Sequence, residues 1–298
     1  MSTTTLETTP PETPPRQTLQ ARGTRGREKW GSPVTYFIAF LFIALCLGPV
    51  LYIVIGGFRD NSQITSSPAG FPTPWRFDNY LDVLTSSTFW QQIGNSAIVA
   101  VTTTIGVVVL GVMVSFVLAR YHFHGRAAMY SLFAAGLMFP MTVAITPLYI
   151  LVKDLGLMNS LAGVILPQIG FGLPVTIIIL VPFLKAIPDE IEEAASIDGA
   201  SRLGFFFRMV VPLSVPGVVT TGILAFVASW NSYLLPLFIL SNQSTYTLPL
   251  GVQAFASQYS VDTASVLAFT SLSMIPALIF FTLFERRIVG GLTGAVKG

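Results

Sequence analysis

The charged side chains and the histidines, which could transfer protons or hold a metal ion, are confined to the polar parts of this chain. The 298 residues include 16 Lys and Arg, 14 Asp and Glu and 2 His, and none of these lies within the six long apolar runs defined below. General acid–base catalysis needs titratable groups in a cavity. Proton-coupled carriers and voltage sensors need charged groups within the membrane. The sequence therefore predicts that the chain is not an enzyme, and it argues against a proton-driven carrier.

The two histidines, His122 and His124, lie in the short basic segment RYHFHGR. Residues two apart share a face of a strand but not of a helix. No carboxylate or cysteine stands near them to complete a metal site, and the single cysteine, Cys46, falls in the first apolar run. We therefore expect this chain to bind no metal ion or cofactor of its own and to form no internal disulfide.

Neutral polar side chains do occur inside the apolar runs. Hydroxyls and amides exchange hydrogen bonds with a polyol, and aromatic rings stack on the apolar face of a sugar ring. Trp230, Asn231 and Tyr233 are our candidates for a substrate pathway of this kind. The alternative is that such residues hold membrane helices together, and it applies to most of the wider set: Asn95, Thr102, Thr103, Thr104, Thr142, Thr146, Gln168, Ser229, Thr270, Ser271 and Ser273.

The strongest motif is the charged segment Glu192 to Gly217, EEAASIDGASRLGFFFRMVVPLSVPG, which separates two apolar runs. Pro188 suits the first position of a short helix, and the acids after it complement the positive end of that helix. Gly199 is expected to end the helix. Ser201 is expected to cap a second helix through Phe205 to Met209.

The small residues of this segment, Ala194, Ala195, Gly199 and Ala200, lie between acidic and aromatic flanks. That pattern predicts a helix that lies in a groove of another protein. A helix on the membrane surface is the alternative, but such helices favour Lys and Arg on the polar face. This one begins with acids instead, so a protein groove fits better.

The chain as a whole has the composition of a membrane protein, with 52% hydrophobic and 10% charged residues. About 20 apolar residues are needed to cross a bilayer as a helix. An all-α fold with six transmembrane spans is therefore predicted. Membrane lipid is an expected partner, and nucleic acid is not. The runs are 34–55, 95–119, 127–152, 161–184, 217–240 and 266–284.

The distribution of positive charge predicts the orientation. Of the 16 Lys and Arg residues, only Arg59, Arg76 and Lys153 fall on the side opposite the termini. Because Lys and Arg in short loops favour the cytoplasm, both termini and the loop at 189–216 are expected there. Residues 1–32 are rich in Thr, Pro, Arg and Glu and are predicted to be a disordered tail. Residues 33–298 are then the transmembrane domain, with a short interfacial helix in FDNYLDVL, from Phe77, on the external side.

The charged segment also matches a known signature: EAA, three residues, Gly, nine residues, then apolar, any residue, apolar and Pro. Glu193, Ala194, Ala195, Gly199 and Pro212 fit it, while Met209 and Val211 replace the usual Ile and Leu. The loop thus resembles that of permease subunits of binding-protein-dependent ABC importers. Asp198, Gly199 and Ala200, with Phe207 and Pro216, narrow the resemblance to the carbohydrate, maltose-type branch. It extends over roughly 77–298 and is closest to the smaller, six-span partner.

The resemblance implies a set of partners in a bacterial-type cell (inner) membrane. They are a second permease subunit, a cytoplasmic ATPase dimer that holds ATP and Mg, and an extracytoplasmic sugar-binding protein. The loop would be the coupling helix that docks on the ATPase, with Glu193 tending to pair with a basic residue there. The external segment before the last span would reach toward the binding protein, and the C-terminal tail would contact the ATPase.

Two other classes of function remain open. One is an intramembrane enzyme or assembly protein, and the other is a self-contained, ion-independent secondary carrier. The chain contains no Gly-Lys dipeptide and hence no Walker-type phosphate-binding loop, so ATP dependence would have to come from a partner. Transport by this chain alone, without an ATPase, would favour the carrier.

Overall fold

The structure is a computed structural model that describes residues 33–255 and 262–296. Within these ranges every regular element is a helix, which confirms the all-α prediction. The chain divides into two compact units, the first ending at Leu47 and the second beginning at Gly48. Helix α1 (Pro33–Gly56) contributes to both. The tail predicted at residues 1–32 lies outside the described residues.

Among the described residues, four helices are long and apolar enough to cross a membrane, and up to six spans result if each of two bent helix pairs counts as one. The four are α1, α4 (Ser87–Arg120), α7 (Leu161–Lys185) and the first part of α14 (Thr263–Val296). The bent pairs are α5 (Arg126–Gly136) with α6 (Met141–Asp154), and Arg202–Leu213 with α11 (Val215–Trp230). The helix that contains the second predicted run, 95–119, begins earlier than that run, because α4 extends back to Ser87.

The third predicted run, 127–152, is not one helix. α5 ends at Gly136, and α6 starts at Met141 with its axis turned by 102°. Pro140 accounts for the break, since proline has no N–H to donate and the residue before it is disfavoured in a helical conformation. The predicted run is therefore two helices separated by a sharp bend, and as a pair they remain a candidate for one span.

The fifth predicted run, 217–240, is also interrupted. α11 ends at Trp230, three residues follow without helical structure, and the short helix α12 (Leu234–Ile239) completes the run. Pro236 explains part of this, because its ring would clash with the carbonyl of Ser232 in a continuous helix. The break exposes the backbone and side chains of 231–233 beside a cavity described below.

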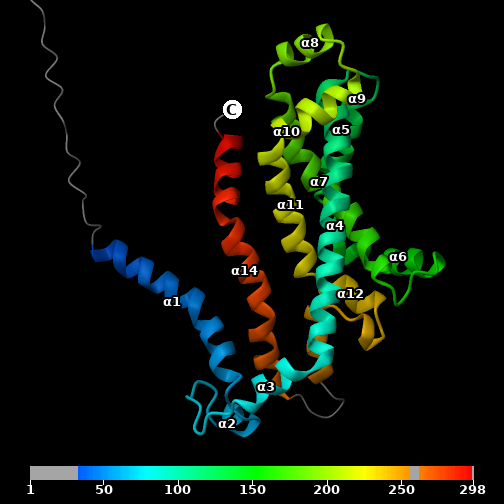
Figure 1. The fold of residues 1–298 in the computed structure, drawn as a ribbon. Helices are drawn as coiled ribbons and strands as arrows, with labels where there is room; N and C mark the ends of the chain where they lie inside the picture. Colours follow the sequence, from blue (N-terminus) through cyan, green and yellow to red (C-terminus); the bar gives the residue numbers. More distant parts are fainter. Residues whose placement is uncertain (1–32, 256–261, 297–298) are drawn as a thin grey trace, which may run out of the picture. The chain divides into compact units, whose positions relative to one another are not determined.

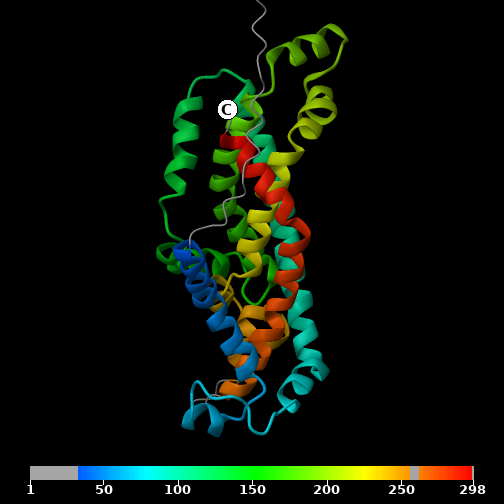
Figure 2. The ribbon, with the colours of Figure 1, turned by 90° about the vertical axis from the view of Figure 1, so that its left-hand side faces the viewer.

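Helices α4, α7 and α11 run side by side, and α14 packs along α11 (Figures 1 and 2). α4 and α7 approach closely because small residues face larger ones across the contact. A Cβ on Gly172 of α7 would lie 2.6 Å from the side chain of Val107, and one on Gly111 of α4 would overlap the methyl group of Thr176. Buried apolar side chains, Leu118, Ile177 and Val181, fill the same interface.

The two ends of the bundle carry different elements. α8 (Asp189–Ile197) and the C-terminal end of α14 lie at one end, and α2 (Asn61–Ser66) and α3 (Asp78–Thr85) lie at the other (Figure 1). The short helix predicted in FDNYLDVL is α3. At this end the Asn61 side chain donates a hydrogen bond of 2.9 Å to Asp262. Burial tends to raise the pKa of Asp262, but donors on Ser265 and Asn61 outweigh it and leave that pKa below its usual value.

Gly163, in the first turn of α7, offers a test of how tightly this bundle is packed. A methyl group there would overlap the carbonyl oxygen of Leu157, which is a backbone atom and cannot rotate away. We expect G163A to lower the free energy of unfolding by about 1–3 kcal/mol, as for other overpacked sites. The measurement is thermal unfolding of the purified protein in detergent. G170A is the matched control, because a Cβ on Gly170 of the same helix meets nothing within 4 Å. Equal melting temperatures for the two variants would contradict this description of the packing.

Candidate functional site

The loop that carries the sequence motif is built from short helices at one end of the bundle. α8 begins at Asp189 after Pro188, so Pro188 is the residue before the helix and not its first member. Asp189, Glu190 and Glu192 occupy the first turn, where negative charge is favoured by the helix dipole. α8 ends at Ile197, and Gly199 has a φ of 78°, a conformation that favours glycine. The predicted stop at Gly199 is confirmed.

The chain then returns to the bundle through an unusual helix. The Ser201 hydroxyl accepts a hydrogen bond of 3.1 Å from the N–H of Gly204 and so caps α9 (Arg202–Phe205), as predicted. α9 continues into the π-helical turn η1 (Phe206–Val210) and into α10 (Val211–Leu213), which contains Pro212. π-helical turns are rare and occur frequently at functional sites. The predicted helix, capped by Ser201 and running through 205–209, thus exists, but it is not a regular α-helix.

One face of α8 belongs to the hydrophobic core. Ala195 is 6% exposed, and it packs in one cluster with Ile187, Phe205 and Phe206 of the loop and with residues at the ends of α4 and α7. Ala195 was expected on the small-residue surface offered to a partner, and its burial corrects that expectation. A small side chain is needed there because α8 lies close to the bundle.

Arg120, the last residue of α4, attaches α8 to the bundle. Its side chain is only 4% exposed. Nη1 donates a hydrogen bond of 2.5 Å to Oδ1 of Asp189 and lies 3.9 Å from Oε2 of Glu192, while Nη2 donates to the carbonyl oxygen of Ile187 at 2.5 Å. The sequence reasoning used Arg120 only as evidence for orientation. Its position at the end of a predicted span could have marked it as a candidate. Its partners could not be predicted, because they lie more than sixty residues away in sequence.

The opposite face of α8 is free. Glu190, Glu193, Ala194 and Ile197 are exposed, and their spacing of three, four and seven residues places them on one helix face. Ile197 is 86% exposed, and Leu203 and Phe207 beyond it are 71% and 66% exposed. The predicted motif residues Asp198, Gly199, Ala200 and Pro212 are exposed as well. Apolar side chains gathered at such an exposed tip are typical of a protein-binding surface. Sequence reasoning missed Ile197 and Leu203.

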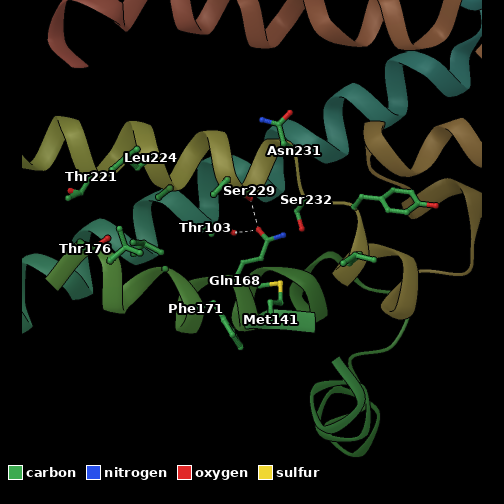
Figure 3. A pocket seen from close by; sticks show the side chains of 17 residues that line it. Thr103, Met141, Gln168, Phe171, Thr176, Thr221, Leu224, Ser229, Asn231 and Ser232 are labelled. Atoms are coloured by element: carbon green, nitrogen blue, oxygen red, sulfur yellow. Dashed lines mark hydrogen bonds between the residues drawn. The ribbon is translucent and has the colours of Figure 1, made fainter. Parts of the chain in front are cut away.

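A cavity of about 680 Å³ lies between α4, α7 and α11. Residues of all three helices line it, together with Met141 of α6 and the break at 231–234 (Figure 3). Among the described residues that line it, none is an Asp, Glu, Lys, Arg or His. The described residues also contain no cluster of three or more side chains of the metal-ligating type. The cavity can therefore accommodate a neutral ligand through hydrogen bonds and apolar contact.

Gln168 of α7 is the central polar group of this cavity (Figure 3). Its Oε1 accepts hydrogen bonds from the Ser229 hydroxyl of α11 at 2.5 Å and from the Thr103 hydroxyl of α4 at 3.3 Å. All three residues belonged to the wider set of neutral polar residues, but none was chosen as a candidate. The sequence could have pointed to Gln168 as a candidate, since it is the only amide side chain in the apolar run 161–184.

The three predicted pathway residues do not form one group. Asn231 and Tyr233 line the cavity. Trp230 points elsewhere: it is 7% exposed, and its ring stacks on Phe226 with 5.7 Å between centroids. Trp230 lines a second hollow between α11 and α14, to which Asn231 also contributes. The Asn231 amide donates to the carbonyl oxygen of Val227 at 2.9 Å, and the Tyr233 hydroxyl accepts from Gln253 at 3.2 Å.

Comparison with known proteins identifies the family of this chain. Residues 108–290 match the family described as "Binding-protein-dependent transport system inner membrane component". The chain belongs to this family. Members are permease subunits of ABC transporters, which are not enzymes themselves. The matched region contains the α8 loop, the cavity helices α7 and α11, and most of α14.

Curated relatives of this permease align over nearly its whole length. The diacetylchitobiose uptake system permease protein NgcG of Streptomyces coelicolor is 34% identical over 92% of this chain and 91% of its own. The trehalose transport system permease protein SugB of Mycobacterium tuberculosis is 36% identical over 87% of this chain and 95% of its own. A solved bacterial ABC transporter that imports the acidic polysaccharide alginate has a chain with a TM-score of 0.72 and 22% identity, covering 85% of this permease and 94% of that chain. At that identity the structural match shows the fold alone.

The attachment of α8 through Arg120 can be measured directly. Replacing Arg120 with Gln removes the ion pair to Asp189, worth about 0.2–1 kcal/mol because Asp189 is 88% exposed. It also removes the charged hydrogen bond to Ile187, worth about 1.5–3 kcal/mol, so we expect amide hydrogen exchange in 189–197 to become at least tenfold faster. Hydrogen–deuterium exchange of the purified protein checks this. K185Q is the matched control, since Lys185 is exposed at the same end of the bundle and forms no ion pair with any described residue. Equal exchange in both variants would show that Arg120 does not hold the helix.

Proposed function

We propose that this permease forms half of the translocation pathway of an ABC importer for a neutral sugar or oligosaccharide, and that it couples to a separate ATPase through the loop at 189–216. The observation that carries the proposal is the two-sided arrangement of α8. One face is fixed to the ends of α4 and α7 through Ala195 and Arg120. The other face, with Glu193 and Ile197, is exposed.

The remaining organisation follows the family. Each bent pair counts as one span, so the chain crosses the cell membrane six times with both termini and α8 in the cytoplasm. The position of the α14 C-terminal end and of α8 at the same end of the bundle supports this orientation (Figure 1). The partners are a second permease subunit, an ATPase dimer that holds ATP and Mg, and an external sugar-binding protein. A solved alginate transporter with a TM-score of 0.61 was captured in complex with a pentasaccharide-bound periplasmic protein.

The neutral cavity supports an uncharged cargo. The relatives named above carry diacetylchitobiose and trehalose, whereas the structural neighbour carries an acidic polysaccharide. An acidic sugar would be expected to meet cationic side chains on its path, and the described lining of this cavity has none. A neutral di- or oligosaccharide is therefore the proposed substrate class.

The coupling step is a rigid-body movement. When the partner ATPase closes on ATP, its groove would displace the exposed face of α8. Arg120 and the buried cluster around Ala195 would transmit that displacement to α4 and α7. These two helices line the cavity, so their movement would switch its access from one side of the membrane to the other. The Glu193 carboxylate would pair with a basic residue of the ATPase.

Reconstitution of the complete complex tests the proposal. The external binding protein is first screened for thermal stabilisation by a panel of neutral di- and oligosaccharides that includes diacetylchitobiose and trehalose. Uptake of the stabilising sugar is then measured in proteoliposomes. We expect uptake that requires ATP, the ATPase and the binding protein. Uptake by this chain without an ATPase, or no uptake of any sugar in the panel, would overturn the proposal.

Variants on the exposed face of α8 test the coupling role. E193K reverses the charge offered to the ATPase, and I197E places a charge at Ile197, which is 86% exposed. We expect both to lower sugar uptake at least tenfold, the effect of losing about 1.4 kcal/mol or more of contact with the ATPase. Membrane insertion should be unchanged, because both side chains are exposed. Uptake and ATPase rate are measured together.

H124E is the control for I197E, since it adds the same charge at an exposed position in the loop between α4 and α5. It should transport at the wild-type rate. Normal uptake by E193K and I197E would mean that the ATPase docks elsewhere.

A further inference from the structure

Gln168 is only partly satisfied in the cavity. Its side chain is buried, with 6% of the residue exposed. Both bonds from Thr103 and Ser229 go to Oε1. The amide nitrogen, Nε2, has no hydrogen-bond partner among the described residues. Buried amide groups almost always have partners, so this nitrogen is an exception that calls for an explanation.

The unpaired nitrogen is itself buried, and it lies on the side of the amide toward Ser232. Figure 3 shows Nε2 directed away from Thr103 and Ser229, toward the space beside Ser232. Gln168, Ser232 and Asn231 all line this same space. A partner for Nε2 would therefore have to come from whatever occupies the cavity. An N–H group requires an acceptor, which selects ligands that present an oxygen at this point.

We propose that Gln168 is a substrate-specificity residue that donates a hydrogen bond from Nε2 to a hydroxyl or acetamide oxygen of the sugar in transit. The inference rests on the proposed function and adds to it the residue and the chemical group that meet. Two features of the lining favour a sugar as the occupant. It carries no charge among its described residues, and it contains the aromatic rings of Phe171 and Tyr233. Aromatic rings with a few placed polar groups are typical of small-molecule sites.

The direction in which Nε2 of Gln168 points depends on two other helices. Thr103 belongs to α4 and Ser229 to α11, and their hydroxyls hold Oε1 of a residue on α7. With Oε1 fixed from both sides, the planar amide can present Nε2 in only one direction. Thr103 and Ser229 are therefore positioning residues, and a displacement of α4 relative to α11 would change the direction of the donor. The contact with the sugar is then expected to exist in one access state of the pathway and not in the other.

The test uses the complete complex in proteoliposomes with the sugar that the wild type imports. Q168L keeps the approximate size of the side chain and removes the donor. We expect the apparent KM for the sugar-loaded binding protein to stay the same and the rate of uptake to fall about three- to tenfold, the size of one net hydrogen bond. ATP hydrolysis stimulated by the loaded binding protein should persist. Uptake by Q168L at the wild-type rate would overturn the inference.

S115A is the matched control. Ser115 of α4 is also buried, and its hydroxyl also lacks a hydrogen-bond partner among the described residues, but it does not line the cavity. Removing it should leave uptake unchanged. Loss of uptake in S115A as large as in Q168L would assign the effect to helix packing and not to the sugar.

A second measurement detects the sugar without relying on transport. In a C46S background, S232C places a thiol beside Gln168, where methyl methanethiosulfonate can modify it. Sugar supplied on the binding protein during ATP turnover should protect this thiol, and adding Q168L should raise the half-protecting sugar concentration about three- to tenfold. S244C, at an exposed position outside the cavity, should not be protected. A thiol at 232 that is inert with and without sugar would show that a protein segment fills the cavity, and would overturn the inference.

The two proposals fail in different ways. If the wild-type complex imports no sugar, the proposed function fails and the assignment of Gln168 falls with it. If the wild type imports sugar and Q168L does so equally well, the importer stands and only the assignment is lost. If sugar protects S232C equally well with Gln168 present and with Q168L, the importer likewise stands and only the assignment of Gln168 is lost.

Discussion

The packing of α4 against α7 is the contact on which both candidate sites depend. At one end of this contact, Arg120 and the buried cluster hold the α8 loop. Toward the other end, Thr103 and Gln168 meet at the cavity. Glycines in the contact allow the two helices to approach closely, so a displacement applied to α8 has little slack in which to be lost. Packed interiors transmit movement in this way because they are close to incompressible.

The irregular segments of the chain lie where they can be tolerated. Within a membrane, non-helical backbone is acceptable only where it is buried in protein or lines an aqueous cavity, since lipid offers no hydrogen bonds. The break after Trp230 contributes Asn231, Ser232 and Tyr233 to the cavity, and the break before α6 brings Met141 to the same place. Both interruptions thus serve to open space between helices that would otherwise pack along their full length.

The features that could be predicted from the sequence are those set by neighbouring residues. Gly199 and Ser201 were assigned correctly because helix ends and caps depend on local chemistry. The features that were missed depend on contacts between distant residues. Arg120 meets Asp189 across 69 positions, and Gln168 meets Thr103 across 65. Trp230 and Asn231 were grouped as neighbours, yet successive residues at a helix end point in different directions. Burial of Ala195 required knowing which face of α8 meets the bundle.

The absence of ionisable side chains from the described lining of the cavity has an electrical consequence. Moving one elementary charge through a membrane potential of 100 mV changes its energy by about 2.3 kcal/mol. A neutral solute that passes a neutral lining carries no charge through the field, and no gating charge moves with it. For the neutral solute proposed above, the membrane voltage would then neither drive nor oppose passage through this cavity.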